Sequence, residues 1–344
     1  MTRRHEDFIS GQGIVFDSIP PELLDAGQGF IAMDRPRHTQ LRRLLVSAFT
    51  PRQMARVADR IEANAHRAVD DIAELGHIDA VAELAALNPM HNICDMMDVP
   101  EQHRREVAHE AQFAGGWRDQ DLLQGAEPAA RLFQSAVRLR EVATELIGRR
   151  RPPPAPADDL LTALVHADVD GARLTDDEIV SFFGLLMVAG NDTTRQSISH
   201  GILALTDHPE QKAWLLADLP RRTPTAVEEI VRWTSPIMTF RRTAARDCEL
   251  AGQQIAAGDK AIMFYASANW DTTDFHHPEV LDFSRSPNPP VSFGGGGVHH
   301  CLGNQLARRQ LAAVFTQLLT RLPDIAVVGQ PARSTGNFCT ASTP

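Results

Sequence analysis

One glycine-rich stretch limits most strongly what this chain can fold into. Residues 291–303 read Val-Ser-Phe-Gly-Gly-Gly-Gly-Val-His-His-Cys-Leu-Gly, so four glycines lead toward a single cysteine, Cys301. Apolar residues then recur at helical spacing as far as Pro323, which predicts a helix that begins at the cysteine. Unpaired N–H groups at a helix N-terminus favour an anion, and a thiolate there is a good metal ligand. The glycines, together with Gly303 two residues after Cys301, let the backbone approach a large, flat ligand closely.

Simpler roles for Cys301 compete with that of a metal ligand. A single cysteine is most often a small buried hydrophobic residue. A zinc site is a poor fit, because no second cysteine stands at ligand spacing and His299 and His300 are too close in sequence to share a tetrahedral site with Cys301 easily. A phosphate cradle is also a poor fit, because no Gly-Lys-Ser/Thr follows the glycines. Among ligand roles, a single axial thiolate to a haem iron remains.

The stretch resembles the haem-binding loop of the cytochrome P-450 family, Phe-Gly-x-Gly-x-His-x-Cys-x-Gly. Phe293 stands one residue further from Cys301 than in that pattern, and the extra glycine resembles a subgroup of actinobacterial members that act on sterol side chains and methyl-branched lipids. The resemblance implies that Cys301 is the proximal ligand of haem b, that Phe293 and Gly303 also lie at the cofactor, and that His299 contacts a propionate. It further implies a mainly α-helical P-450 fold, a helical bundle around a buried haem with small β-sheets.

Composition sets bounds on the class of protein. The chain has 344 residues, of which 43% are hydrophobic, and its formal net charge of −10 argues against general nucleic-acid binding. The four cysteines show no framework spacing, so we expect reduced thiols in a cytoplasmic protein. The longest apolar run, residues 179–190, is too short to span a bilayer, and residues 2–6 are not followed by the apolar region of a secretory signal.

A second motif lies in the helix predicted after Pro36. His38 and Arg42 are four residues apart and share one helix face, which by spacing alone is more often a solvated cationic surface. The corresponding helix of the family carries His-x-x-x-Arg, which holds the haem propionates, so the resemblance implies that role for both residues. It implies the same contact for Arg242, which precedes several short strand-like segments.

The most informative helix after the cysteine begins at a capping box, residues 175–178, and its apolar residues cover nearly all faces, as in a buried helix. Gly190, Asp192, Thr193 and Thr194 follow without a break, although a glycine and a carboxylate in a buried helix cost stability. Either Asp192 and Thr194 face solvent, or Thr193 bonds back to a carbonyl and bends the helix. The resemblance implies instead that Gly190 leaves room beside the oxygen site and that Asp192 and Thr193 deliver protons there.

A third group is implied to be scaffolding. Glu229 and Arg232 are three residues apart on a helix predicted from Pro224, where a surface pair would contribute only about 0.2–0.5 kcal/mol. The family has a buried Glu-x-x-Arg at this place, tied to a later arginine that Arg285 matches. We therefore expect all three residues to support the cysteine loop and not to take part in the chemistry.

The resemblance extends over residues 5–338 and predicts one cytochrome P-450 domain over residues 1–344. The N-terminal helix and most of a small sheet that the family has, together with its final C-terminal strand, are expected to be missing. Residues 325–344 are expected to return as short strands that line the substrate pocket.

The predicted function is that of a haem-thiolate monooxygenase, which inserts one oxygen atom of O2 into a C–H bond of an apolar small molecule, whether sterol, branched lipid, terpenoid or polyketide. Electrons would come from a ferredoxin with its ferredoxin reductase, because no flavin or nicotinamide domain fits in this length. Four arginines form either a basic dock for an acidic ferredoxin or an ordinary solvated face: Arg42, Arg43, Arg308 and Arg309. The alternatives are a haem-binding protein without turnover (a sensor, a carrier or a clipped remnant) and a peroxide-driven peroxygenase. The intact acid–alcohol pair disfavours both.

Overall fold

The computed structural model describes residues 1–16, 29–48, 51–117, 119, 123, 125–152, 159–333 and 342–343, and the fold is mainly α-helical. The longer helices of the described residues are α2 (Arg37–Ala48), α3 (Pro51–Ile72), α4 (Leu87–Met96), α5 (Glu101–Gly115), α7 (Pro128–Arg150), α9 (Asp176–Asp207), α11 (Leu219–Thr234) and α13 (Asn304–Arg321). The shorter ones are α8 (Leu160–Val165), α10 (Pro209–Leu216) and α12 (Tyr265–Asn269), with single turns at Gly29–Ala32, Val81–Ala85 and Val291–Phe293.

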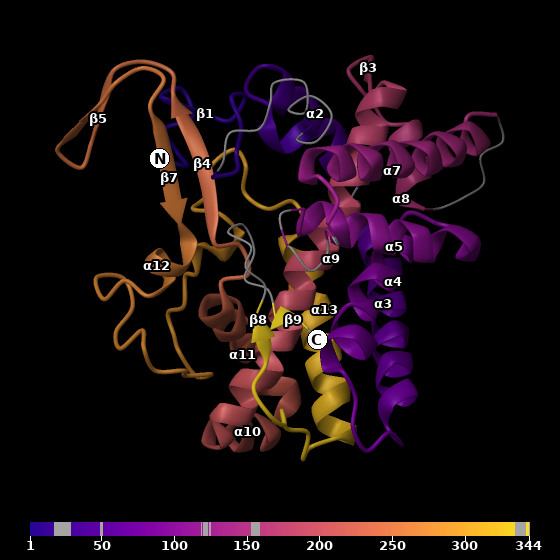
Figure 1. Ribbon diagram of the computed structural model, residues 1–344, viewed down its shortest axis with the longest axis vertical. Coiled ribbons are helices and arrows are strands. Elements are labelled where there is room, and N and C mark those ends of the chain that lie inside the picture. Colours follow the sequence, from indigo (N-terminus) through magenta and orange to yellow (C-terminus); the bar gives the residue numbers. More distant parts are fainter. Residues whose placement is uncertain are drawn as a thin grey trace.

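Helix α9 runs through the middle of the molecule, between the other helices (Figure 1). Its 32 residues correspond to a length of about 48 Å. The expected capping box is present: the Glu178 N–H donates to the Thr175 hydroxyl at 3.2 Å and the Thr175 N–H donates to the Glu178 carboxylate at 2.9 Å. Helices α4, α5, α7, α11 and α13 all pack against α9, so the prediction of a buried helix is confirmed.

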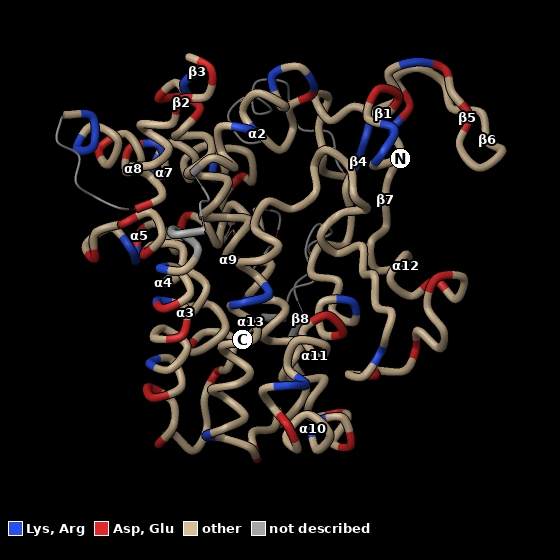
Figure 2. Tube along the Cα trace, turned by 180° about the vertical axis from the view of Figure 1, so that it is seen from behind, with Lys and Arg blue, Asp and Glu red and all other residues tan. Residues whose placement is uncertain are grey.

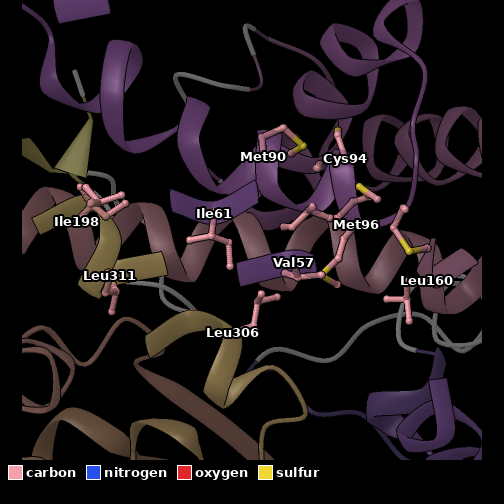
Figure 3. Packing of buried hydrophobic residues seen from close by; sticks show 14 of the residues in the cluster. Val57, Ile61, Met90, Cys94, Met96, Leu160, Ile198, Leu306 and Leu311 are labelled. Carbon is pink, nitrogen blue, oxygen red and sulfur yellow. The ribbon is translucent and has the colours of Figure 1, made fainter. Parts of the chain in front are cut away.

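The main hydrophobic core lies where α3, α4, α9 and α13 meet (Figure 3). The buried side chains labelled there come from these helices and from α8: Val57, Ile61, Met90, Cys94, Met96, Leu160, Ile198, Leu306 and Leu311. Because α13 continues directly from the cysteine loop (residues 291–303), this core fixes one end of that loop relative to α9.

A small antiparallel sheet stands beside the helices, on the left in Figure 1. Its order is β1 (Phe8–Ile9), β4 (Thr239–Ala244) and β7 (Lys260–Phe264), with Thr239 opposite Phe264 and Phe8 opposite Ala244. Two-stranded pairs are formed by β2 (Asp168–Val169) with β3 (Ala172–Arg173), β5 (Cys248–Leu250) with β6 (Gln253–Ile255), and β8 (Ala332–Arg333) with β9 (Ser342–Thr343).

Some element boundaries differ from those expected. The helix predicted from Pro224 begins at Leu219, because the Asp218 carboxylate caps it by accepting the Arg221 N–H at 3.4 Å. The last long helix begins at Asn304 and not at Cys301, because residues 301–303 complete the loop and Gly303 is the N-cap. The expected C-terminal strands appear as β8 and β9, while residues 334–341 lie outside the described residues. None of the described helices combines the length and apolarity needed to cross a membrane.

Candidate active site

The cysteine loop folds back on itself before α13 begins. The Cys301 N–H donates to the Phe293 carbonyl at 2.9 Å, and the His300 N–H donates to the Gly297 carbonyl at 3.0 Å. Gly294 has φ +94°, a left-handed conformation that a side chain would strain. Burial raises the pKa of the Cys301 thiol, against the opposing effects of the Gly303 N–H and two nearby arginines. A sulfur held in a half-buried loop of this shape is placed to bind a metal that replaces its proton.

The glycine run is packed against the first residues of the chain. The Thr2 hydroxyl and the Arg3 guanidinium both donate to the Gly295 carbonyl, each at 3.3 Å. A Cβ atom on Gly297 would lie only 1.9 Å from the Thr2 carbonyl oxygen. The structure therefore gives a local reason for glycine at position 297, the close approach of two backbones.

Two of the expected propionate ligands meet. The rings of His38 and His299 have centroids 4.2 Å apart, and His38 also stacks on Phe30 at 4.7 Å. The Ser10 hydroxyl lies 3.1 Å from His299 Nε2, whereas His38 Nε2 is buried without a partner among the described residues. Burial lowers the pKa of His38 to about 4 and that of His299 to about 3, so both rings are neutral at pH 7. Each neutral ring can donate one N–H to an anion.

Two arginines lie close to these rings. Arg42 donates from Nη2 to the His300 carbonyl at 2.7 Å, and Arg242, 6% exposed, donates to the Arg241 carbonyl at 2.7 Å. Within the described part of the chain no ion pair joins Arg42 or Arg242 to a carboxylate. Buried cations are normally paired. Two arginines and an unpartnered imidazole nitrogen therefore fit a ligand that brings its own carboxylates, as haem does with its propionates.

The proton-delivery candidates lie on α9, and the structure decides between the alternatives for them. Asp192 and Thr194 are buried, 5% and 3% exposed, so they do not face solvent. Thr193 does bond back along the helix, because its hydroxyl donates to the Ala189 carbonyl at 2.8 Å. Asp192 forms an ion pair with Arg195, one turn further along α9. The acid and the alcohol are therefore adjacent in sequence but bonded to different partners.

One face of α9 is not covered by the described residues. Ala189 is exposed although it stands in the middle of this long buried helix, and Leu185 and Thr193, four residues to either side, are only half-buried. Residues at this spacing share a face, so the open strip runs along the helix. Gly190 lies beside it and packs closely on α4, since a Cβ there would come within 2.6 Å of Ile93 Cδ1. An uncovered strip inside a helical bundle fits a flat cofactor and an apolar molecule.

Glu229, Arg232 and Arg285 are brought together in one buried network. Both Glu229 and Arg232 are 0% exposed and form a two-point pair, with Nε to Oε2 at 2.8 Å and Nη2 to Oε1 at 2.7 Å. Arg285 Nε and Asn288 Nδ2 reach the same carboxylate at 3.1 and 3.0 Å. Arg232 also donates to the Asn269 carbonyl at 2.9 Å, and the Asn269 side chain accepts the Val291 N–H at 2.8 Å. The network is thus connected to the start of the cysteine loop.

Sequence reasoning missed three contributors to the site. Arg195 could have been found, because it stands three residues after Asp192 on a predicted helix. Ser10 and Asn269 gave no signal, since each reaches the site only through the tertiary fold, toward His299 and Val291.

The four arginines of the supposed ferredoxin dock do not form one exposed surface. Arg308 pairs with Glu228 and lies over the Phe293 ring, 4.3 Å from its centroid. Arg42 is turned toward the cysteine loop, so only Arg43 and Arg309 are exposed. Figure 2 shows basic and acidic segments interspersed along the trace.

Comparisons with known proteins show which family the chain is similar to. A profile of the family described as cytochrome P450 matches residues 122–323. The methyl-branched lipid omega-hydroxylase of Mycobacterium tuberculosis is 42% identical over 97% of this chain and 78% of its own length. The steroid C26-monooxygenase of Rhodococcus jostii is 39% identical over 92% of this chain and 65% of its own length.

The structure of Mycobacterium marinum cytochrome P450 CYP268A2 in complex with pseudoionone superposes with a TM-score of 0.94 at 55% identity, over 99% of this chain and 82% of that one. The predicted P-450 fold is thereby confirmed. The profile match and the identity over nearly the whole chain lead to one conclusion: the chain belongs to the cytochrome P450 family.

Proposed function

We propose that this cytochrome P450 monooxygenase binds haem b through Cys301 and inserts one oxygen atom of O2 into a C–H bond of an apolar, lipid-like molecule. The observation that carries the proposal is the half-buried Cys301 thiol beside buried or half-buried nitrogen donors that lack a carboxylate partner among the described residues: His38, Arg42 and Arg242. A protein that only carries or senses haem would need the same ligand, but it would not need an adjacent acid and alcohol, Asp192 and Thr193, with the alcohol on the open strip of α9.

The residues that would hold the cofactor divide by the part they contact. Cys301 would be the iron ligand, with Phe293 and Gly303 in the loop around it. The propionates would be held by charge and by hydrogen bonds from two arginines and two histidines: His38, Arg42, Arg242 and His299. Bound haem supplies the activation of dioxygen, which a thiolate ligand favours by donating electron density.

Proton delivery is the task we propose for Asp192 and Thr193. Insertion of one oxygen atom from O2 releases the other as water, so two protons must enter a site that excludes bulk water. For each proton, the Asp192 carboxylate takes one from solvent and passes it to the Thr193 hydroxyl oxygen. Thr193 gives up its own proton in the same step, so both residues return to their starting state. The bond from Thr193 to the Ala189 carbonyl keeps the hydroxyl on the open strip.

The substrate class follows from the open strip of α9 and from the relatives. Leu185, Ala189 and Thr193 along this strip offer mainly apolar atoms. The related enzymes are named for methyl-branched lipids and for steroids, and the similar solved structure holds pseudoionone. We therefore propose a sterol, a methyl-branched lipid or a terpenoid as substrate.

We also propose that electrons come from a ferredoxin and its ferredoxin reductase in the cytoplasm. Cys94, Cys248 and Cys301 are all unpaired thiols, as expected in a reducing compartment, and Cys339 lies outside the described residues. Arg43 and Arg309 are the exposed members of the basic set and are the positions where charge reversal should slow reduction.

The test combines a spectrum with a turnover assay. The reduced, haem-loaded protein should give the carbon monoxide difference band of thiolate-ligated haem. Cys301→Ala should abolish this band, and Cys94→Ala, which alters a buried thiol elsewhere, should keep it. With ferredoxin, reductase and NADH, we expect oxygen consumption to rise on addition of pseudoionone, a methyl-branched fatty acid or a steroid with an intact side chain. Normal haem loading without substrate-dependent oxygen consumption for any probe would favour the haem-binding alternative.

A further inference from the structure

The Asp192 carboxylate is enclosed by two neighbours. On its own helix, Arg195 Nη2 donates to Asp192 Oδ1, and both residues are buried, 9% and 5% exposed. On the adjoining helix α5, the last residue is Gly115, and a Cβ there would lie 3.5 Å from Asp192 Oδ2. Asp192 therefore points toward α5, and within the described part of the chain Arg195 is its only side-chain hydrogen-bond partner.

Helix geometry shows what this pairing does to the acid. Successive residues of an α-helix are about 100° apart, so Asp192 and Arg195 lie about 60° apart and share a face. Thr193 lies on the next face, with Ala189, where its hydroxyl is already bonded. The ion pair therefore holds the carboxylate off the open strip of α9, and a proton can reach Thr193 only when the carboxylate leaves Arg195.

We propose that Arg195 is a positioning residue that keeps the buried Asp192 carboxylate charged and turned away from Thr193 between proton transfers. This role rests on the proposed function, because it acts on the proton relay described there. A buried carboxylate without a cation is costly, so it would keep a proton instead of remaining ionised. A neutral Asp192 can give up that proton once, but it then becomes an unpaired buried anion. The positive charge of Arg195 stabilises the ionised carboxylate, so Asp192 can bind and release a proton in each cycle.

A double-mutant cycle separates this role from a purely structural one. The variants are Asp192→Asn, Arg195→Gln and the combination, each as holoenzyme with ferredoxin, reductase and NADH, and with pseudoionone as the probe. We expect each single change to lower product formed per NADH by about tenfold or more and to enlarge the solvent deuterium isotope effect. The combination should be no worse than Asp192→Asn, because Arg195 has no function in the relay once the carboxylate is gone. Arg195→Lys should recover part of the yield.

The outcomes are distinct. If Arg195→Gln lowers product per NADH by the same factor in the parent protein and in Asp192→Asn, Arg195 acts independently of Asp192 and the proposal is wrong. If Asp192→Asn alone leaves the yield unchanged, the relay itself is wrong. Arg173→Gln, an exposed arginine on β3, is the matched control for loss of one positive charge and should change neither readout.

A second measurement does not depend on turnover. The infrared spectrum of Arg195→Gln at neutral pH should show an added C=O band of a protonated carboxyl group, absent from the parent protein and from the combined variant. Such a band missing from Arg195→Gln would mean that Asp192 stays ionised without Arg195, which contradicts the proposal. The carbon monoxide difference spectrum of each variant confirms that the haem site is intact.

Discussion

Arg42 on α2 donates a 2.7 Å hydrogen bond to the carbonyl oxygen of His300, the residue immediately before Cys301. The two residues are 258 positions apart in the chain, so this bond fixes the cysteine loop against a distant helix. The same helix carries His38, whose ring lies beside that of His299. Helix α2 therefore contacts the loop at both His299 and His300, and we expect a change in α2 to alter haem binding.

Arg42→Leu should weaken haem retention. Hydrogen bonds from a charged donor contribute about 1.5–3 kcal/mol, so haem should transfer to excess apomyoglobin roughly tenfold faster or more. Arg43→Leu, an exposed neighbour on the same helix, should leave the transfer rate unchanged. Equal transfer rates in the two variants would show that Arg42 only covers the loop.

Glu229→Gln should destabilise the fold strongly. The change leaves Arg232 and Arg285 buried without their shared counter-charge, which for a buried pair costs about 3–5 kcal/mol. Urea unfolding measures the loss. The matched control is Glu141→Gln, which breaks an exposed pair with Arg138 and should cost less than about 1 kcal/mol. A similar midpoint for both variants would remove the scaffolding role.

Thr193→Ala should divert reducing equivalents from product to hydrogen peroxide, with about a tenfold or greater loss of product per NADH. The reason is that the relay loses its last hydroxyl while the fold keeps its packing. Ser199→Ala removes the same kind of bond on the same helix, from the side-chain oxygen to the Arg195 carbonyl at 3.0 Å. Ser199→Ala should leave product formed per NADH unchanged. Comparable peroxide release from both variants would argue that helix distortion, and not proton transfer, is responsible.

Gly297→Ala should destabilise the protein by about 1–3 kcal/mol, because the new methyl group collides with the Thr2 carbonyl. Gly148→Ala is the matched control in the exposed last turn of α7, where a Cβ meets nothing within 4 Å. It should stabilise the protein by roughly 0.5–1 kcal/mol. Thermal unfolding distinguishes the opposite signs, and stabilisation by Gly297→Ala would contradict the close backbone contact.

Glu110 should contribute to acid sensitivity. Burial raises the pKa of its carboxyl, but hydrogen bonds from Arg131 and Ser135, both at 2.7 Å, outweigh burial and hold this pKa below its usual value. A group with a lowered pKa in the folded state stabilises it fully above the unfolded pKa of about 4.3 and loses this contribution as the pH falls through the folded value. Urea midpoints of Glu110→Gln should therefore fall less steeply than those of the parent below about pH 4.3. Parallel curves for the two proteins would exclude this carboxyl as a contributor.

Local sequence signals predicted local structure well. The capping box at Thr175 and the buried character of α9 are confirmed, because both depend on neighbouring residues only. The start of α13 was misplaced by three residues, since the backbone of residues 301–303 is used to close the loop. The fold and the enzyme class came from the resemblance around Cys301, and the comparisons confirm them.

Partners distant in sequence could not be predicted from local pattern. Whether Asp192 faced solvent depended on Gly115 of α5, which no spacing rule connects to it. Arg285 was linked to Glu229 only through the family pattern, and Asn269 was not foreseen at all. Burial of these groups is a property of the assembled helices, and it decides whether an ion pair is a surface contact or part of the scaffold.

The contact between Thr2 and Gly295 joins positions 293 apart. Contacts of such long range form slowly, because the loop-closure entropy is lost before they are made. Residues 291–303 can therefore take their final shape only after the chain has closed this long loop, so we expect the contact to Thr2 to be among the last native contacts made in folding.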